Sequence, residues 1–523
     1  MPNVPKVGRR AHSGLVALVV IGAIAAPLRS GDASDTSTIL GSVSHALADP
    51  GAPSARNVAV SGSVFGSGSS GSFRTWTSDD RERTEQVLGA RVQRTLRLGD
   101  RRWIADENGF VRELTGTLAR RERTQQFIDG GAFVEHPERC ALRGYGRVDG
   151  RTTLDLDVAA PGGDVERVAF DPRTWLPARI AYDDDDGRST ITLGDWRTVA
   201  GRRYPFSAVA SNGDRAFDVT QTTTSIDTSP IDPSVFAPLA ARASLVSEQE
   251  TIPLVEREGH LFAPVTIADR TYEFLIDSGT QDIVLDRHVA GELGLAAGGA
   301  FEASGARRTG GVALASVPGL QVGARERLGP LVVASFDLGG MLHGRRVDGI
   351  LGYPFFASAE VRLDAAAKSM TVGAPGSFTP SGTRLPVDLD RALVETNVRL
   401  GGALDAPLLV DTGNAAELLL YRPFARAHPG LVAYTARLRR AYGVGGHTAS
   451  YRTSLGRLDV ADVSFYNVDT DVMLATSGAY ADRTDAGNLG LGVLRNLIVT
   501  FDVANAALYV DRGREYDDGR SRN

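Results

Sequence analysis

The chain contains almost no cysteine: Cys140 is the one cysteine among 523 residues. An intrachain disulfide is therefore excluded, and this thiol is expected to stay free. A single thiol near His136 supplies too few ligands for a zinc site. The eight histidines are scattered without a pair at ligand spacing, so we expect neither a metal site nor a Ser-His-Asp triad.

Several motifs of common enzymes and binding proteins are also missing from the sequence. No Gly-x-Ser-x-Gly elbow is present, and no glycine-rich loop continues into Lys-Ser or Lys-Thr, as a phosphate-binding loop would. We therefore expect no cofactor. The net charge of −6 is mild, and no block of lysine and arginine with interleaved aromatic residues occurs, so nucleic acid is not an expected partner.

What the sequence does contain is a pair of short cassettes in its second half. Phe274–Thr280 and Leu408–Asn414 each lead an apolar, strand-like run into an Asp-Ser-Gly or Asp-Thr-Gly turn. Each cassette is followed at a similar interval by a glycine pair, Gly349–Gly352 or Gly487–Gly490. Two copies in the same order indicate an internal duplication.

A single Asp-Ser-Gly or Asp-Thr-Gly turn carries little weight, because such turns occur for their backbone preferences alone. Under that interpretation Asp277 and Asp411 only end two strands. The duplication favours a paired-carboxylate site with one aspartate from each half. A further aspartate closes each copy, and we expect these two residues, Asp364 and Asp502, to lie in hairpin turns and not in the site.

On these cassettes and glycine pairs, residues 250–513 resemble two retropepsin-type aspartic protease halves fused in one chain. The resemblance implies a mainly β fold with two acid-protease β-barrel lobes, at 250–375 and 383–513, related by a pseudo-twofold axis. It also implies that Asp277 and Asp411 face each other over one water. The site would be complete within one chain, so we expect a monomer.

Paired carboxylates suit peptide hydrolysis, because two such groups within hydrogen-bond reach share one proton. The ionised group accepts a proton from water, and the protonated group donates to the peptide carbonyl. Gly279 and Gly413 permit a sharp turn and close approach of the loops. The resemblance implies that the hydroxyls of Ser278 and Thr412 bind across to the opposite loop and that Thr280 supports a carboxylate.

Two features of the halves are less regular. Asn414 departs from the small or hydroxyl residue usual at its position, although its amide can still donate a hydrogen bond. Each half should also contain a glycine-rich hairpin that closes over the substrate as a flap. The candidate flap glycines are Gly310, Gly311, Gly445 and Gly446, and ordinary surface turns are the alternative.

The start of the chain has the layout of a secretory signal. Lys6, Arg9 and Arg10 precede the apolar run 15–26, as in signal peptides. This run is short for a membrane span, although a retained anchor is the alternative for residues 1–33. We therefore expect an exported protein, periplasmic or extracellular.

Residues 36–242 are expected to form one domain, in which a short helix at 39–48 precedes successive short strands from about residue 57, separated by turns. They resemble the open β-barrel of periplasmic lipoprotein-carrier-like proteins in the segments 171–177, 194–205 and 231–238. The resemblance implies a half-barrel antiparallel sheet whose concave apolar face holds a lipid, a lipoprotein or a peptide. A packed scaffold without a ligand is the alternative.

The sequence as a whole predicts an aspartic-type endopeptidase that acts on a protein or peptide bound in an extended conformation. The rival prediction is a non-catalytic envelope protein that binds lipid, lipoprotein or peptide. Because both cassettes lie in the second half, a fragment beginning near Ser247 is expected to fold alone. Residues 514–523 are expected to form a flexible tail.

Overall fold

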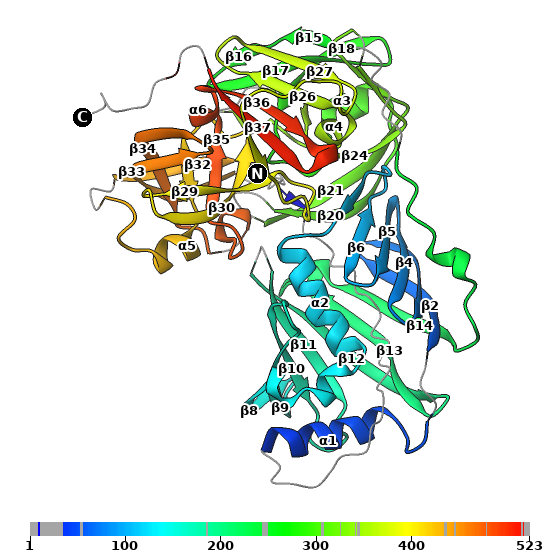
Figure 1. Cartoon of the computed structure of the whole chain (residues 1–523). Coiled ribbons are helices and arrows are strands. Elements are labelled where there is room, and N and C mark those ends of the chain that lie inside the picture. Colours follow the sequence, from blue (N-terminus) through cyan, green and yellow to red (C-terminus); the bar gives the residue numbers. More distant parts are fainter. Residues whose placement is uncertain are drawn as a thin grey trace, which may run out of the picture.

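The structure is a computed structural model that describes residues 9–10, 35–52, 56–184, 187–242, 249–304, 308–324, 326–339, 341–342, 346–433, 437–443, 446–476, 478–513 and 516. It is mainly β, as expected, with sheets of 13, 11, 7 and 6 strands in the described part. The 13-stranded sheet forms the lower part of the molecule in Figure 1, and the other sheets form the upper part. The apolar run at the start of the chain lies outside the described residues.

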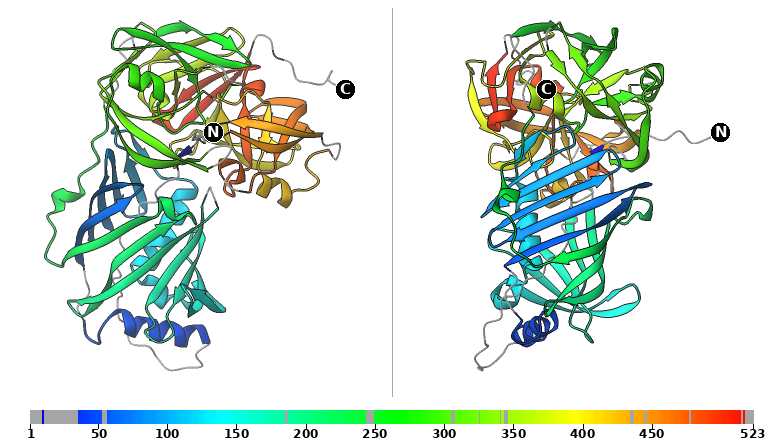
Figure 2. Two further views of the ribbon diagram at one scale, coloured as in Figure 1. Left: turned by 180° about the vertical axis from the view of Figure 1, so that it is seen from behind. Right: turned by 90° about the vertical axis from the view of Figure 1, so that its right-hand side faces the viewer.

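The first domain is built on the 13-stranded antiparallel sheet (Figure 2). Its strands, in their order across the sheet, are β7 (Val111–Glu113), β6 (Arg101–Ala105), β5 (Arg91–Leu98), β4 (Arg81–Leu88), β3 (Ser69–Ser78), β2 (Asn57–Gly66), β14 (Val219–Asp227), β13 (Arg202–Ser211), β12 (Gly187–Val199), β11 (Pro177–Asp184), β10 (Val165–Phe170), β9 (Arg151–Ala159) and β8 (Cys140–Val148). Buried and more exposed residues alternate along parts of β2, β4 and β12, as in a sheet with one covered face.

Two helices, α1 (Asp35–Leu47) and α2 (Thr117–Asp129), pack against this sheet. One stripe of α1 is apolar at helical spacing, and its Leu40, Val43 and Leu47 are buried in a core shared with β9 to β13. Ile128 of α2 belongs to the same core. Helical side chains therefore fill this part of the sheet face, where the sequence predicts a ligand-holding surface or a packed scaffold.

The two halves of the second part repeat one strand order. The sheet of lobe 1 contains β1 (Arg9–Arg10), β20 (Ala297–Ser304), β21 (Arg308–Val317), β24 (Leu331–Phe336), β19 (Val284–Asp286), β25 (Gly349–Leu351), β18 (Arg270–Ile276), β17 (His260–Ile267), β22 (Leu320–Val322) and β23 (Glu326–Leu328), with β16 (Val255–Arg257) beside β17. The sheet of lobe 2 contains β29 (Glu395–Leu400), β30 (Leu404–Asp411), β35 (Gly487–Gly490), β31 (Leu418–Leu420), β34 (Val463–Met473), β33 (Gly446–Val460) and β32 (Arg437–Gly443). The parallel pair β18–β25 of lobe 1 is matched by β30–β35 of lobe 2.

A six-stranded sheet joins the lobes. Its strands are β15 (Glu250–Pro253), β27 (Ser369–Gly373), β26 (Glu360–Asp364), β36 (Leu497–Asp502), β37 (Ala507–Arg512) and β28 (Thr383–Pro386). The central pair β26–β36 is antiparallel, with Val361 opposite Phe501. The closing aspartates lie in hairpin turns, because Asp364 accepts from Ala367 N and Asp502 accepts from Asn505 N.

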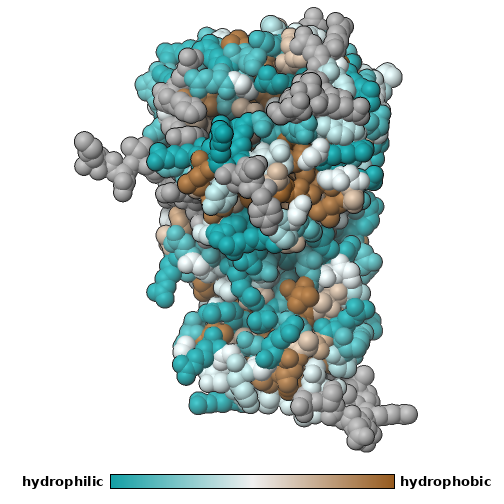
Figure 3. Space-filling view, turned by 90° about the vertical axis from the view of Figure 1, so that its left-hand side faces the viewer, coloured by the Kyte–Doolittle hydropathy of each residue, from teal (hydrophilic) through white to brown (hydrophobic). Residues whose placement is uncertain are grey.

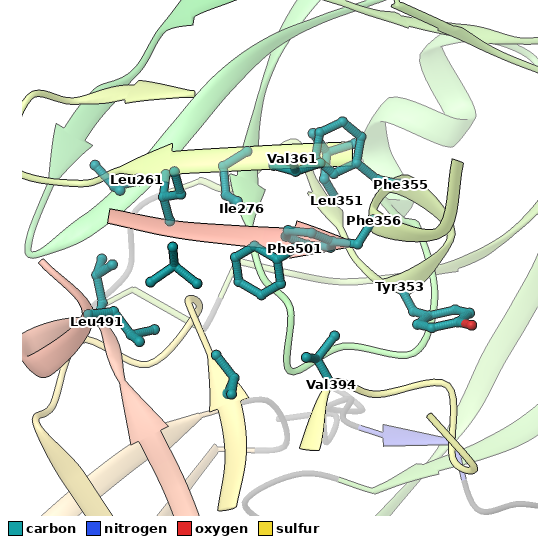
Figure 4. Close-up of a cluster of buried hydrophobic side chains, with 14 of the residues drawn as sticks. Leu261, Ile276, Leu351, Tyr353, Phe355, Phe356, Val361, Val394, Leu491 and Phe501 are labelled. Carbon is teal, nitrogen blue, oxygen red and sulfur yellow. The ribbon is translucent and has the colours of Figure 1, made fainter. Parts of the chain in front are cut away.

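Short helices follow corresponding strands in the two lobes. They are α3 (Arg287–Glu292) and α4 (Tyr353–Ser358) in lobe 1, and α5 (Arg422–Ala427) and α6 (Leu491–Leu494) in lobe 2. One hydrophobic core runs through both lobes, and Figure 4 shows part of it. Its centre includes Phe356 and Phe501, whose ring centroids are 4.8 Å apart, so the lobes are built as one unit.

The outer surface carries separate apolar patches among hydrophilic residues on the face shown in Figure 3. The exposed large apolar side chains of the described residues are Phe65, Val87, Leu142, Tyr145, Val165, Val255, Leu438 and Tyr451. Among the described residues, no helix combines the length and apolar character that crossing a membrane requires.

The first domain shares buried surface with lobe 1 of the second part. Val64, Leu88 and Val219 of the first domain belong to one apolar cluster with Phe301 and Phe336 of lobe 1. A fragment that begins near Ser247 would expose this cluster to water. The shared cluster therefore argues against the independent folding that the sequence suggests for such a fragment.

A carboxylate of the second part also caps a helix of the first domain. Helix α2 has no side-chain cap at Gly116. Asp390 supplies the missing acceptors, because its carboxylate accepts hydrogen bonds from the backbone N–H groups of Thr115, Gly116 and Ala119 at 2.6, 2.9 and 2.9 Å. A negative charge at a helix N-terminus is also favoured by the helix dipole, so this contact ties the two parts together.

The neighbouring Asp388 makes this junction sensitive to pH. A Cβ added at Gly116 would lie 1.1 Å from Asp388 Oδ2, so the carboxylate occupies the space above that glycine. Burial and the nearby charge of Asp390 raise the pKa of Asp388 from 3.8 to about 6. The folded protein therefore holds this proton more tightly than the unfolded chain does.

We expect the stability due to Asp388 to be full below about pH 4 and to be lost as the pH rises through about 6. The expected loss in unfolding free energy is about 2 kcal/mol between these limits. The Asp388→Asn variant should lack this part of the pH dependence in thermal melts, whereas replacement of the exposed Asp405 by asparagine should keep it. A melting profile of Asp388→Asn that parallels the original chain at every pH would contradict the expectation.

Candidate active site

Buried strands deliver the two cassette aspartates to the same place. Strand β18 ends at Ile276 and strand β30 ends at Asp411. The last three residues of β18 and the three apolar residues before Asp411 in β30 are buried, and each strand runs beside its parallel partner, β25 or β35. Asp277 N donates to Leu351 O at 3.1 Å, so the loop that carries Asp277 begins where the pairing of β18 with β25 ends.

A reciprocal set of hydrogen bonds joins the two loops. Ser278 Oγ donates to Val410 O at 2.7 Å and accepts from Thr412 N at 3.1 Å. Thr412 Oγ1 donates to Ile276 O at 2.9 Å and accepts from Ser278 N at 3.0 Å. All four bonds are buried and connect residues more than 130 positions apart. We call this set the cross-loop grip.

The glycines of the two loops let each carboxyl group lie against the opposite loop. A Cβ added at Gly279 would be 2.6 Å from Asp411 Cγ, and one added at Gly413 would be 2.3 Å from Asp277 Cγ. Each carboxylate also accepts from the glycine N–H of its own loop, at 2.8 Å in lobe 1 and 3.1 Å in lobe 2. Any side chain at either glycine would displace a carboxylate.

The glycine pairs pack directly behind these loops. A Cβ at Gly352 would be 2.1 Å from Asp282 O, and one at Gly490 would be 2.1 Å from Ala416 O. Glycine is therefore required at these two positions for a steric reason, since the backbone at the ends of β25 and β35 approaches the loops too closely for a side chain.

The Oδ2 atoms of the two aspartates have different hydrogen-bond partners. Thr280 Oγ1 donates to Asp277 Oδ2 at 2.7 Å. Asn414, at the matching position, accepts from Ala416 N through Oδ1, and its Nδ2 is buried without a hydrogen-bond partner in the described part of the chain. Asn414 therefore does not take over the role of Thr280.

A residue missed by the sequence analysis takes that role. Asn488 Nδ2 donates to Asp411 Oδ2 at 2.5 Å, and the side chain of Asn488 is buried. The signal was present in the duplicated glycine pair, because the lobe 1 copy has Ile350 where the lobe 2 copy has Asn488. A lone polar residue in an otherwise apolar buried strand needs a polar partner.

Two hairpins lie where the flaps are expected, β20–β21 in lobe 1 and β32–β33 in lobe 2. Gly310 and Gly311 lie within β21, and Gly446 begins β33. Gly445 and residues 305–307, which connect β20 to β21, lie outside the described residues. Closure of these hairpins over a substrate stays a prediction.

The hairpins differ in their surroundings. Phe301 of β20 is buried against the first domain, and the Arg91 guanidinium lies 4.7 Å from the centre of its ring. In the lobe 2 hairpin, Leu438 and Tyr451 face each other across the strands and are 67% and 41% exposed. The first domain therefore holds one hairpin, whereas the other presents apolar side chains to water.

A pocket beside the lobe 1 loop is also shared with the first domain. Gln281 and Asp282, which follow Thr280, line it together with first-domain residues that include Arg91 and Arg112. The side chain of Gln281 also donates to Arg391 O of the second part at 2.5 Å. The first domain thus forms one wall beside the candidate site.

The cross-loop grip should contribute to both stability and geometry. Ser278→Ala or Thr412→Ala removes a hydroxyl that makes two buried bonds and leaves its partners unsatisfied, so each should lower the unfolding free energy by about 2 kcal/mol. Calorimetric melting provides the measurement. Thr412→Ser keeps the hydroxyl and serves as the control, and unchanged melting of both alanine variants would show that the grip adds nothing to stability.

Comparison with known proteins gives one family match. Residues 263–355 match the aspartyl protease family model, whose description is "Aspartyl protease". This match covers β18, the Asp277 loop and the glycine pair of lobe 1. No curated protein sequence matches the chain.

Three of the solved structures that match the chain overlap about two fifths of it. They are a DUF1329 family protein from Desulfovibrio piger (12% identity, 40% of this chain and 98% of that chain, TM-score 0.29), an outer membrane lipoprotein-sorting protein domain from Vibrio parahaemolyticus (8%, 38% and 95%, TM-score 0.28) and a LolA superfamily protein from Nitrosomonas europaea (12%, 39% and 99%, TM-score 0.28). Overlaps with such low TM-scores carry no conclusion about what the first domain binds. The family match and the repeated strand order together give the conclusion that the chain contains an aspartyl-protease-like lobe at residues 263–355, followed by a second lobe of the same design.

Proposed function

We propose that the protein is an aspartic-type endopeptidase that uses Asp277 and Asp411 as one catalytic pair. The observation that carries this proposal is the cross-loop grip, which holds the two aspartate loops together from opposite lobes. A merely structural pair of Asp-Ser-Gly and Asp-Thr-Gly turns would not need each carboxylate to lie on the glycine of the other loop. The aspartyl protease match over lobe 1 supports the same assignment.

In this mechanism one aspartate is ionised and the other carries a proton, because two adjacent carboxylates cannot both be charged cheaply. The ionised carboxylate accepts a proton from a water molecule as that water attacks the peptide carbonyl carbon. The protonated carboxyl donates to the carbonyl oxygen. The carbon becomes tetrahedral, and its collapse with proton transfer to the nitrogen breaks the peptide bond.

The substrate is proposed to be a peptide or protein segment in an extended conformation. Strand β32, at the edge of the lobe 2 sheet, offers backbone groups for β-addition, whereas β20 of the lobe 1 hairpin pairs with β1. Gly310, Gly311, Gly445 and Gly446 are the proposed flap glycines. The exposed Leu438 and Tyr451 of the lobe 2 hairpin favour apolar substrate side chains.

Export and a monomeric state belong to the same proposal. Export rests on the basic and apolar residues at the start of the chain. The monomer rests on the presence of both aspartate loops in one chain. A site of this kind needs no second copy to be complete.

The test is cleavage of a mixed peptide library by the full mature chain from acid to neutral pH. Cleavage that a statine-type inhibitor blocks is the expected result, and the Asp277→Asn/Asp411→Asn double variant gives the background. A folded chain that cuts no peptide and binds no statine in calorimetry would overturn the proposal in favour of a non-catalytic peptide- or lipid-binding protein.

A further inference from the structure

The two lobes support their aspartates with different chemical groups. In lobe 1 the group is the hydroxyl of Thr280, and in lobe 2 it is the side-chain amide of Asn488. Asn488 stands in β35 where the lobe 1 strand has Ile350. The difference lies at the centre of an otherwise repeated design, so it separates the two carboxylates chemically.

The orientation of the Asn488 amide is set by a second buried residue. Tyr421 Oη donates to Asn488 Oδ1. The Tyr421 side chain is fully buried, with its ring 6.3 Å from that of Tyr480 between centroids. With Oδ1 engaged by Tyr421, the opposite end of the amide, Nδ2, is directed at Asp411.

A side-chain amide N–H and a hydroxyl differ in the hydrogen bonds that they can make. The Nδ2 group can only donate a hydrogen bond, whereas a hydroxyl can donate or accept. A donor aimed at a carboxylate oxygen favours the ionised form of that carboxyl. Asp411 Oδ2 faces a group that cannot accept a hydrogen bond from a protonated carboxyl, but Asp277 Oδ2 faces Thr280, whose hydroxyl can turn to accept one.

We propose that Asn488, held by Tyr421, is a positioning residue that fixes the roles of the two aspartates, with Asp411 ionised and Asp277 protonated before the substrate is attacked. This inference rests on the proposed function for its catalytic meaning. The water then gives its proton to Asp411 while its oxygen bonds to the carbonyl carbon, and Asp277 gives its proton to the carbonyl oxygen. The pair ends this step with its proton on Asp411, so protons and charge balance.

The test uses two variants in which only one acid of the pair remains. Aspartates are labelled with carbon-13 at the carboxyl, and the remaining acid is titrated by NMR in Asp277→Asn and in Asp411→Asn. Adding Asn488→Leu, which gives lobe 2 an apolar residue like that of lobe 1, should raise the pKa of Asp411 by about one to two units. The same change should leave Asp277 nearly unmoved.

Two further variants separate positioning from structural damage. Tyr421→Phe keeps the ring but frees the amide to turn, so it should raise the pKa of Asp411 by a smaller amount at unchanged fold. Adding Asn414→Thr to Asn488→Leu offers a hydroxyl at the position equivalent to Thr280 and should reverse part of the shift. A purely structural role of Asn488 would give neither the selectivity for Asp411 nor this reversal.

The outcomes distinguish this inference from the proposed function. Equal shifts of both acids, or no shift of Asp411 with either Asn488→Leu or Tyr421→Phe, would overturn the role of Asn488. A selective shift in a chain that cuts no peptide would leave the assignment of Asp411 intact and refute the peptidase. In an active chain, the acid limb of the kcat/KM profile should move to higher pH in Asn488→Leu, in step with the NMR shift.

Discussion

Asp277→Asn and Asp411→Asn are each expected to reduce peptide cleavage about a thousandfold or more. Either change removes one acid from a pair that exchanges a proton with water and substrate in the same step. The double variant should be no slower than the single variants, because residues that act as a unit have non-additive effects. The rate on a peptide cut by the original chain is the measurement.

The repeat supplies its own control for this experiment. Asp364 is the last aspartate of the lobe 1 copy, and Asp277 is the first. The carboxylate of Asp364 accepts a hydrogen bond from a backbone N–H in a turn. Asp364→Asn should therefore keep nearly the full rate. Independent partial losses in Asp277→Asn and Asp411→Asn that add in the double variant would contradict a shared site.

Removal of residues 1–246 is expected to destabilise the remaining protein strongly. The deletion removes Val64, Leu88 and Val219 from the apolar cluster that they share with lobe 1, and it exposes Phe301, which also contacts Arg91. Exposure of the Phe301 side chain alone costs about 2 kcal/mol. The fragment should melt at lower temperature than the full chain, and because Phe301 lies in the lobe 1 hairpin, it should also cleave peptides poorly.

Co-production of the two pieces, 35–242 and 249–523, is the matched control. Their shared cluster and the Asp390 contact with α2 should bring them together, so the mixture should regain both melting temperature and rate. A fragment 249–523 that is as stable and active alone as the full chain would show that the shared cluster contributes little.

The sequence was sufficient to predict the duplicated lobes, because their signals are local. A buried strand, an aspartate and a Ser/Thr-Gly turn lie within seven residues in Phe274–Thr280, and the glycine pair is demanded by close backbone packing. The mainly β class was implied by the resemblance of the second half to retropepsin-type lobes and by the short strands expected in the first domain. The prediction that Asp364 and Asp502 lie in hairpin turns depended on local turn chemistry, and the structure has them there.

The flap glycines were harder to place, because glycine marks many kinds of turn. Gly310 and Gly311 lie inside β21, although the sequence suggested a hairpin tip. The pairing of β20 with β21 depends on the residues of both strands and on contacts with the first domain. The three residues around Gly310 carry no information about either.

The separate folding of the second part was suggested because the sequence shows where the cassettes are and not what covers the lobes. Phe301 in a hairpin reads as one more apolar strand residue, but it shares a buried apolar cluster with Val64 and Leu88, more than 200 positions earlier in the chain. Asp390 reads as a loop acid, yet it caps α2. Such contacts join segments whose separation in sequence carries no signal.

The sequence by itself determined the two aspartate loops, their glycines and hydroxyls, and the β-rich class, because each depends on neighbouring residues and steric demands within a few positions. Only the tertiary structure decided which group supports Asp411, since Asn414 lies next to the loop and Asn488 reaches it from a strand 77 positions away. The same is true of the junction at Asp390. Hydrogen bonds and apolar contacts depend on how close two groups lie in space, and only folding brings groups from distant parts of the sequence together.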